Sequence, residues 1–468
     1  MIARPVRGGC SAFRGVNQPK GFMAEYRANT RNDLPRIGKM LGLNCDQIID
    51  MQAVSAVLPF RVNDYVVKNL IDRESLPADP IFQLTFPQRE MLTDEDFKDM
   101  RDLVSSRASE SEICQAALKV RQKLNPHPAG QLELNKPKFG DDTLEGMQHK
   151  YNEPVLFFPA QGQTCHAYCT YCFRWAQFIG DTDLKFASKD AKQLVKYVRD
   201  NPQISSVLIT GGDPMVMKTK VLRQFIDPLL DIPHLDSIRV GSKALAYWPY
   251  RFTQGKDADD FLRLIGQVRA RDKQFALMAH SSHPRELEPA PAREALRRVI
   301  SAGAIVRCQA PLIKHVNDHQ DIWADLWRKQ VKLGAVPYYM FIERDTGPKN
   351  YFEVPLARAF NIFTRAYRQV SGLSRTVRGP SMSATPGKAL IDGITEIAGE
   401  RVFVLKFLQG RNPDWVNRVF FAKFDPQACW LDELEPAFGE DNFFYETEME
   451  KIASKDLGGS ANTMQLGL

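Results

Sequence analysis

Six short apolar segments alternate with helical segments through the middle of the chain, and this alternation restricts the fold more than any other feature. The apolar segments recur at steps of roughly thirty residues, and Gly303 and Gly334 close two of the helical stretches between them. They occupy residues 154–160, 205–210, 237–241, 275–280, 304–309 and 336–342. Strands that alternate with helices predict βαβ units and a parallel sheet. Six units instead of eight predict an α/β fold with a partial (β/α)6 barrel of the TIM type.

The patterning divides the chain into three expected regions. Residues 1–145 are expected to be mainly helical, because segments 46–58 and 112–124 carry apolar residues at a spacing of three to four. Residues 146–374 hold the predicted barrel, and residues 375–468 form a C-terminal α+β extension.

Loops that follow the strands of such a barrel collect its catalytic residues at one rim. The loop after the first predicted strand holds three cysteines, and the second strand is followed by "GGD" at residues 211–213. His280 and Gln309 end the fourth and fifth strands. We therefore expect all four features to lie at the same rim.

Composition excludes several classes of protein. The 468 residues are 44% hydrophobic and 25% charged, which is ordinary for a soluble globular protein. The sequence holds no run of about 18 apolar residues, so no membrane span is predicted. Residues 1–15 lack the apolar stretch of a secretory signal, so none is expected. The net charge of +6 is spread along the chain without a basic block, so no nucleic-acid partner is expected.

Cysteine usage indicates a reducing, cytoplasmic setting. Eight cysteines in a chain of this length are too sparse for a disulfide framework. Five of them are scattered singly, and most of these are expected to be small buried or half-buried residues: Cys10, Cys45, Cys114, Cys308 and Cys429.

The other three, Cys165, Cys169 and Cys172, lie in "CHAYCTYC" with C-x₃-C-x₂-C spacing. An odd number in a reducing compartment disfavours a disulfide. A structural zinc site requires four ligands, commonly two paired C-x₂-C units, and the chain has no second unit. Iron–sulfur clusters are held by thiolates at this kind of spacing. Three cysteines on a four-iron cluster leave one iron with an open position, which suits a cluster that binds a substrate.

This loop, with Tyr171 just before its last cysteine, resembles the cluster loop of the radical S-adenosylmethionine superfamily. Further segments occur in the order found in lysine 2,3-aminomutase and its relatives, from about residue 50 to about residue 425. They include "HKYNEPVLFFP", "GGDPMV", "RVGSKALAYWPYRFT", "HSSHPREL", "QAPLIKHVND" and "PYYMF". The resemblance implies the radical type of barrel, with a [4Fe-4S] cluster on the three cysteines. It also implies S-adenosyl-L-methionine, cleaved to a 5′-deoxyadenosyl radical by an electron from a flavodoxin- or ferredoxin-type donor.

The resemblance also implies roles for individual residues. Those expected to meet S-adenosylmethionine are Gly211, Gly212, Asp213, Ser242, His280 and Gln309. Lys388 matches the lysine that forms a Schiff base with pyridoxal 5′-phosphate, although only Gly387 remains of a four-glycine run before it. Of two arginines that help hold the cofactor phosphate in the family, Lys150 keeps one positive charge and Pro154 replaces the other.

The expected substrate pocket departs from that of the lysine enzymes. Arg174 matches the arginine that pairs with the substrate α-carboxylate. Two aspartates that bind the lysine ammonium are replaced at Arg344 and Ser381, which predicts a substrate other than free lysine. A fixed cation favours an acidic or hydrogen-bond-accepting side chain, glutamate being the simplest case. The alternative is that Arg344 pairs internally with Glu343 or Asp345.

The sequence thus predicts an isomerase, a radical 2,3-aminomutase that moves an amino group between the α and β carbons of an amino acid. One alternative is a radical enzyme of the same fold without mutase activity, acting on another amine or a peptide. Another is a non-catalytic iron–sulfur or zinc-binding protein. A homodimer or homotetramer is expected, because the amphipathic N-terminal helices require an apolar surface and relatives pack them on a partner subunit.

Overall fold

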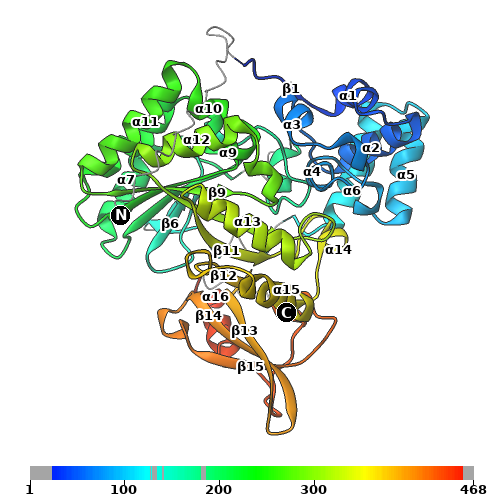
Figure 1. Cartoon of the computed structure of the whole chain (residues 1–468). Coiled ribbons are helices and arrows are strands. Elements are labelled where there is room, and N and C mark those ends of the chain that lie inside the picture. Colours follow the sequence, from blue (N-terminus) through cyan, green and yellow to red (C-terminus); the bar gives the residue numbers. More distant parts are fainter. Residues whose placement is uncertain (1–23, 127, 129–133, 140–141, 181–185, 457–468) are drawn as a thin grey trace, which may run out of the picture.

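A computed structural model describes residues 24–126, 128, 134–139, 142–180 and 186–456. Residues 1–23 lie outside the described part. They include Cys10 and residues 1–15, for which no secretory signal was expected. Within the described part, one mixed sheet holds eleven strands in sequential order from β5 to β15 (Figure 1). The six predicted strands are β6 (Pro154–Phe157), β7 (Ser206–Ile209), β8 (Ser237–Ser242), β9 (Gln274–His280), β10 (Ile305–Leu312) and β11 (Val336–Ile342). Each is parallel to the next, so the predicted run of parallel strands is confirmed.

Helices between the strands cover one face of this sheet. They are α7 (Ala191–Asp200), α8 (Thr219–Ile226), α11 (Gly255–Ala270), α12 (Ala290–Ser301), α13 (Gln320–Lys332) and α15 (Leu356–Arg368). Strand residues such as Val240, Val306 and Ile342 enter the hydrophobic core on that side, where each fully buried side chain contributes about 1.5–3 kcal/mol. Alternation along a strand sends the intervening residues to the opposite face. We call that opposite face, which carries Arg239, His280, Gln309, Tyr339 and Phe341, the inner face.

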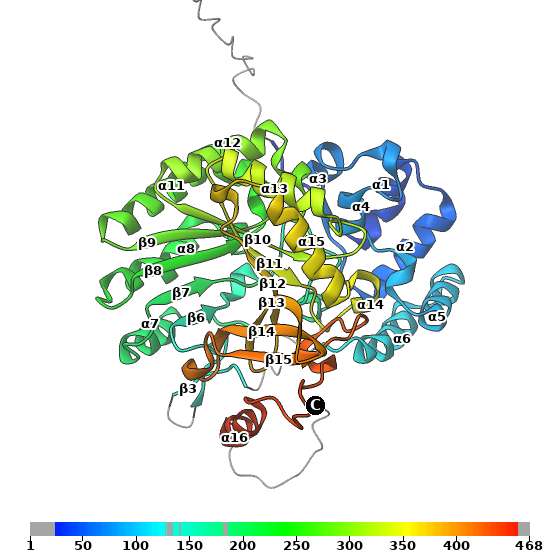
Figure 2. The same ribbon diagram turned by 60° about the horizontal axis from the view of Figure 1, so that its bottom comes forward.

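The C-terminal region continues the same sheet (Figure 2). Strand β12 (Arg378–Ser383) runs parallel to β11, and β13 (Gly387–Ile397), β14 (Glu400–Gly410) and β15 (Val419–Lys423) follow in antiparallel order. Helix α16 (Glu446–Asp456) ends the described chain. A Cβ at Gly387 would lie 2.4 Å from the carbonyl oxygen of Gln409, so only glycine permits this approach of β13 to β14. This contact fixes the backbone next to Lys388.

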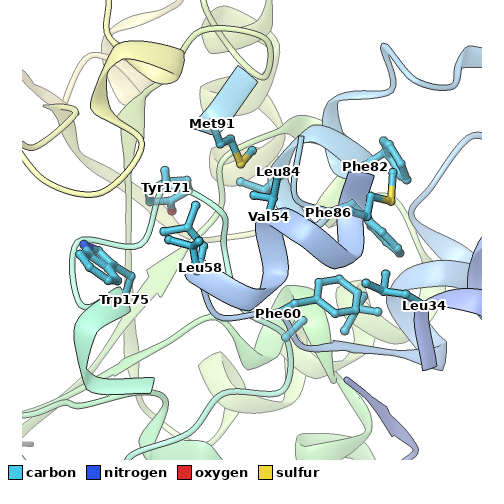
Figure 3. Close-up of a cluster of buried hydrophobic side chains, with 14 of the residues drawn as sticks. Leu34, Val54, Leu58, Phe60, Phe82, Leu84, Phe86, Met91, Tyr171 and Trp175 are labelled. Carbon is cyan, nitrogen blue, oxygen red and sulfur yellow. The ribbon is translucent and has the colours of Figure 1, made fainter. Parts of the chain in front are cut away.

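The described part of the N-terminal region is mainly helical, and it packs against the cysteine loop. Its helices are α1 (Leu34–Leu41), α2 (Cys45–Val57), α3 (Asp64–Asn69), α4 (Pro80–Thr85), α5 (Asp94–Ser105) and α6 (Glu110–Lys123). Val54 and Leu58 share a hydrophobic cluster with Tyr171 and Trp175 of the cysteine loop (Figure 3). Part of the apolar surface that these helices require is therefore supplied by the same chain.

Several short elements complete the described chain. They are β1 (Ala28–Asn29), β2 (Val62–Asn63), β3 (Lys138–Phe139), β4 (Asp142–Thr143), β5 (Met147–Gln148), α9 (Ala244–Tyr247), α10 (Tyr250–Thr253) and α14 (Lys349–Phe352). Among the described helices, none combines the length and the apolar character required to cross a bilayer.

Candidate active site

The loop after β7 holds the cysteine loop in place through its two glycines. The amide of Gly212 donates to the carbonyl oxygen of Gly162 at 3.1 Å, and the amide of Asp213 donates to that of Thr164 at 2.7 Å. A Cβ at Gly212 would lie 2.5 Å from the Thr164 carbonyl oxygen. Gly211 adopts a φ of +151°, which disfavours other residues. The "GGD" turn therefore brings the first two rim loops into direct backbone contact.

The three thiols of the cysteine loop lie close enough to act on one another. Burial raises the pKa of Cys165, Cys169 and Cys172, that of Cys172 to about 12, and the charge of Cys169 raises the pKa of both Cys165 and Cys172 further. The three groups are therefore neutral thiols near pH 7, and a bound metal group would be needed to hold them as thiolates, the form that binds iron.

The geometry of the thiols bears on which metal group fits. Within the described residues, no three His, Cys, Asp or Glu side chains converge closely enough to hold one metal ion. A structural zinc ion takes four ligands, whereas this loop offers three thiols. A four-iron cluster takes each thiolate on a different iron, so its ligands do not converge on one point. The donor set fits the cluster better than it fits zinc.

A buried ion pair lies directly behind the cysteine loop. Lys243 Nζ is 2.6 Å from Glu286 Oε1, and the Glu286 side chain is fully buried. The backbone amides of Ser282 and His283 donate to its other oxygen, at 2.5 and 3.0 Å. Among the charged groups around Cys169, the Lys243 ammonium has the largest effect and lowers the pKa of that thiol. The pair therefore places a fixed positive charge beside one of the three sulfurs.

Asp213 and Ser242, both expected to meet S-adenosylmethionine, bind each other. The Ser242 hydroxyl donates to both carboxylate oxygens of Asp213, at 2.8 and 3.0 Å, and the amides of Met215 and Lys243 donate to the same carboxylate. Burial raises the pKa of Asp213 to about 6 despite these donors. The two side chains join the loop after β7 to the loop after β8, so their polar atoms position the rim.

His280 and Gln309 lie side by side at the rim. His280 Nε2 and Gln309 Nε2 are 3.0 Å apart, at the end of β9 and within β10. Burial lowers the pKa of His280 to about 4, and the nearby Lys243 ammonium lowers it further. The imidazole is therefore neutral at physiological pH, so one of its nitrogens can accept a hydrogen bond.

Arg174 has an anion-binding capacity that the protein does not use. Its guanidinium stacks on the ring of Phe158 at 4.2 Å, and its Nη2 donates to Gln163 Oε1 at 3.3 Å. Its buried Nε has no hydrogen-bond partner, and no described carboxylate forms an ion pair with it. Burial lowers its pKa to about 10, which leaves it charged. An incoming carboxylate would satisfy the unpaired donor.

Lys388 lies on the inner face near the start of β13. Its Nζ donates to Gln409 Oε1 at 3.0 Å and sits 4.2 Å from the centre of the Tyr339 ring. Burial lowers the pKa of Lys388 to about 7, and the charges of Arg378 and Arg239 lower it further. A large fraction of the amine is therefore neutral and nucleophilic near pH 7. This environment fits a lysine that binds an aldehyde, and it rules out an ordinary loop lysine in solvent.

Lys150 and Arg344 are two further basic side chains in the region of Lys388. The Lys150 ammonium donates to the carbonyl oxygen of Ala384. Burial lowers its pKa well below the usual range, and the charges of Arg411, Arg344 and Lys388 lower it further. The half-buried Arg344 guanidinium lies 5.1 Å from the centre of the Phe173 ring, and its Nε and Nη2 have no hydrogen-bond partner.

The alternative of an internal ion pair for Arg344 is not seen in the described part of the chain. Neither Glu343 nor Asp345 comes within ion-pair distance of it, although both carboxylates act on its pKa. Ser381 lies on β12 opposite Phe341, fully buried, and its hydroxyl also lacks a partner. Both positions that replace the aspartates therefore carry unused hydrogen-bonding groups.

Comparison with known proteins establishes the family. A protein of Aquifex aeolicus (strain VF5), provisionally named an L-lysine 2,3-aminomutase, is 32% identical over 298 residues, which cover 64% of this chain and 76% of that protein. The chain belongs to the radical S-adenosylmethionine lysine 2,3-aminomutase family. The named activities of this family are isomerisations, so the chain is a member of an enzyme family.

Other members of the aminomutase family match over shorter lengths. The L-lysine 2,3-aminomutase of Acetoanaerobium sticklandii is 28% identical over 233 residues, and the glutamate 2,3-aminomutase of Clostridioides difficile is 26% identical over 210. The matches cover 50% and 45% of this chain, and 53% and 47% of those relatives, so the chain spans about half their length. No protein-family model matches. Among solved structures, Streptococcus suis SuiB bound to its precursor peptide SuiA aligns with a TM-score of 0.34 and 14% sequence identity. The alignment covers 59% of this chain and 58% of SuiB.

Sequence reasoning missed the Lys243–Glu286 pair in this aminomutase-family chain. Both residues lie in segments that were matched to the family, "RVGSKALAYWPYRFT" and "HSSHPREL", but neither carries a motif of its own. Lys243 lies just after the strand predicted at residues 237–241, and Glu286 lies in the loop after the strand predicted at residues 275–280. Nothing in either position indicates that the two side chains are in contact. Their pairing depends on β8 and β9 being neighbours in the sheet.

Replacing Gly212 with Ala is expected to destabilise the rim. The added methyl group would lie 2.5–2.7 Å from backbone atoms of Thr164, and overpacking of this kind costs about 1–3 kcal/mol. Thermal unfolding should therefore occur at a lower temperature, and the three thiols should react faster with a thiol reagent. Gly266→Ala is the matched control, because a Cβ there meets open space on helix α11. Equal stability of the two variants would contradict this interpretation of the turn.

Proposed function

We propose that the chain is a radical aminomutase that moves an amino group between the α and β carbons of an amino acid with an anionic side chain. The observation that carries this proposal is the environment of Lys388, a half-buried amine whose Nζ lies 3.0 Å from Gln409 Oε1 and 4.2 Å from the centre of the Tyr339 ring, and whose pKa is lowered to about 7 by desolvation. Two guanidiniums with unused donors, Arg174 and Arg344, support it. Membership of a family that includes lysine and glutamate enzymes narrows the reaction class.

We further propose that the parallel strands form a partial barrel of the radical type, which places the cofactor groups on its inner face. Cys165, Cys169 and Cys172 would hold a [4Fe-4S] cluster, and the rim residues Gly211, Gly212, Asp213, Ser242, His280 and Gln309 would shape the site for S-adenosylmethionine. When bound, the cluster and S-adenosylmethionine supply a carbon radical, and pyridoxal phosphate supplies the carbonyl that carries the migrating nitrogen. Lys388 would hold that carbonyl, with Lys150 nearby as a cation for the phosphate.

The chain's own residues would orient the substrate. Arg174 would bind the α-carboxylate with its free Nε, beside the cysteine loop, where the fork geometry fixes the carboxylate in one plane. Arg344 would bind an anionic group at the far end of the substrate, and Ser381 would donate a hydrogen bond from the neighbouring strand. A lysine ammonium at that end would face two cations, Lys150 and Arg344, and is disfavoured.

The remaining proposals concern the setting of the reaction. A flavodoxin- or ferredoxin-type protein would supply the electron, and the enzyme would work in the cytoplasm as a homodimer or homotetramer.

The proposed reaction is tested with the reduced, reconstituted enzyme and a panel of amino acids, with detection of β-amino products by mass. We expect an anionic amino acid such as glutamate to give a β-amino isomer and lysine to give little or none. Reductive cleavage of S-adenosylmethionine without any β-amino product would contradict the proposal, and efficient conversion of lysine would contradict the anionic substrate class.

Replacing Arg344 with Asp is expected to shift the preference from an anionic substrate toward lysine. A charge-assisted hydrogen bond contributes roughly 1.5–3 kcal/mol, so the ratio of kcat/KM values should change more than about tenfold. Because Ser381 is fully enclosed, the single Arg344→Asp variant is the cleaner measurement, and the double variant with Ser381→Asp serves as the second. Arg365→Asp, on the exposed side of α15, is the matched control and should leave the ratio unchanged.

A further inference from the structure

Three arginines lie together on the inner face, outside the set of residues that the family resemblance identified. Arg239 lies on β8, Arg307 on β10 and Arg378 on β12. Val240 follows Arg239 on β8, and Val306 precedes Arg307 on β10. Both valines enter the core on the helix-covered side. Because side chains alternate along a strand, Arg239 and Arg307 face the other way. The three side chains therefore come from separate strands to one region of the inner face.

Two tyrosines of β11 form the centre of this arginine group. The pairing of β10 with β11 shifts by one residue between Cys308 and Gln309, so that Tyr338 and Tyr339 stand next to each other with ring centres 4.5 Å apart. The Arg378 guanidinium lies 4.5 and 4.3 Å from the centres of these two rings, and that of Arg307 lies 5.1 Å from the centre of the Tyr338 ring. Both guanidiniums therefore lie within cation–π distance of these rings, which favours their positions.

No described carboxylate neutralises this group. Neither an ion pair nor a side-chain hydrogen bond joins Arg239, Arg307 or Arg378 to another described residue, and the buried Nε of Arg239 has no partner. All three side chains are half-buried, so water compensates them only in part. A concentration of positive charge with unused donors in such a place fits a multivalent anion, and guanidiniums match the oxygens of a phosphate group.

The arginine group is adjacent to Lys388. The Tyr339 ring that Arg378 stacks on also lies 4.2 Å from Lys388 Nζ. Arg378 and Arg239 are the two cations that act most on the Lys388 ammonium. Lys150, in contrast, has Arg411 and Arg344 as its strongest charged neighbours and belongs to a second cationic group. Lys388 thus lies between two separate groups of cations on the inner face.

We propose that Arg239, Arg307 and Arg378 hold the phosphate of the pyridoxal phosphate whose aldehyde meets Lys388. This inference rests on the proposed function and deepens it. The three arginines would replace the positive charge that is lost where Pro154 stands at a phosphate-binding arginine of the family. Lys150 would then no longer be needed to bind the cofactor phosphate. With the phosphate on the three arginines, Lys150 and Arg344 are left together for the anionic end of the substrate.

The test compares pyridoxal phosphate with pyridoxal, which lacks the phosphate, on the full chain. Imine absorbance gives a dissociation constant for each compound, and borohydride reduction followed by mass analysis reports labelling of Lys388. In the unaltered chain pyridoxal phosphate should bind at least about a hundredfold more tightly than pyridoxal, as several charge-assisted contacts imply. In Arg307→Met and Arg378→Met this ratio should fall by about tenfold or more, while the affinity for pyridoxal stays the same.

Comparison variants make the outcome specific. Arg401→Met removes another arginine stacked on an aromatic ring, that of Phe424 at 3.8 Å, and should leave the ratio unchanged. Arg307→Lys keeps the charge and should restore part of the ratio. Inorganic phosphate, tested on the unaltered chain, should compete with pyridoxal phosphate at millimolar concentration and not with pyridoxal.

Two results would overturn the proposal, and they differ. If Lys150→Met lowers the ratio and the arginine variants do not, the phosphate lies on the second cationic group, and the proposed reaction is unaffected. If neither compound forms an imine with Lys388 in the unaltered chain, the aldehyde cofactor itself is wrong, and the proposed function falls with the phosphate site.

Discussion

Replacing Cys165, Cys169 or Cys172 with Ala should abolish both turnover and the charge-transfer absorbance of the reconstituted protein. Each thiolate would ligate its own iron, so losing one leaves the cluster with two protein ligands and a second open iron. Activity should fall by several orders of magnitude, because no other group in the site can generate a radical. Iron and sulfide content after anaerobic reconstitution, with the visible spectrum, measures the effect.

Cys114→Ala is the matched control for this experiment. Cys114 is an exposed free cysteine on helix α6, so its loss should change neither the iron content nor the spectrum. A triple variant of the cysteine loop that still retains four irons and four sulfides per chain would show that the cluster lies elsewhere. It would also remove the basis for the radical reaction.

Replacing Lys388 with Ala should abolish imine absorbance with pyridoxal phosphate and reduce β-amino product to background. In the unaltered chain, the rate of imine formation should rise as the pH increases through about 7, where the pKa of Lys388 lies. The direction follows because only the neutral amine attacks an aldehyde, and burial has lowered the pKa from the usual value of about 10.4. The measurement is the initial rate of imine absorbance between pH 5.5 and roughly pH 9, a window that brackets this pKa.

Lys406→Ala provides the comparison for Lys388. Lys406 lies on the neighbouring strand β14 and pairs with Asp392 at 2.9 Å, away from the arginine group. Its loss should leave both imine absorbance and its pH dependence intact. A midpoint for imine formation near pH 10 in the unaltered chain would show that the burial of Lys388 does not set its reactivity.

The parallel strands were predictable because their signal is local. Each is a short apolar run between helices whose ends carry glycine, and the order of parallel neighbours then follows from right-handed crossover connections. The C-terminal strands gave a weaker signal. Residues 375–468 were expected as an extension, but β12 pairs with β11 in the same sheet, and a pairing between strands leaves no periodic mark in either sequence.

The candidate site was predictable only where a motif defines it. The cysteine spacing and the "GGD" turn are contiguous, so sequence alone located them. Lys388 could be found only through the family resemblance, because its environment depends on Gln409 and Tyr339 from two other strands. The arginine group was not found at all. Arg239, Arg307 and Arg378 are isolated in sequence, and a register shift at Tyr338 that no residue pattern predicts brings them around one pair of rings.

The packing of the N-terminal helices on the cysteine loop has a consequence for biosynthesis. Val54 and Leu58 leave the ribosome before Tyr171 and Trp175, the residues that they contact in the finished protein. The intervening stretch of roughly 100 residues takes on the order of ten seconds to translate. During that interval α2 packs only on its N-terminal neighbours such as α5 and α6, and nascent chains that stop short of Trp175 leave the part of the cluster that Tyr171 and Trp175 complete exposed. Chaperone binding and aggregation should therefore concentrate on such truncated chains, and the loop that carries the cysteines ends that exposure as it folds.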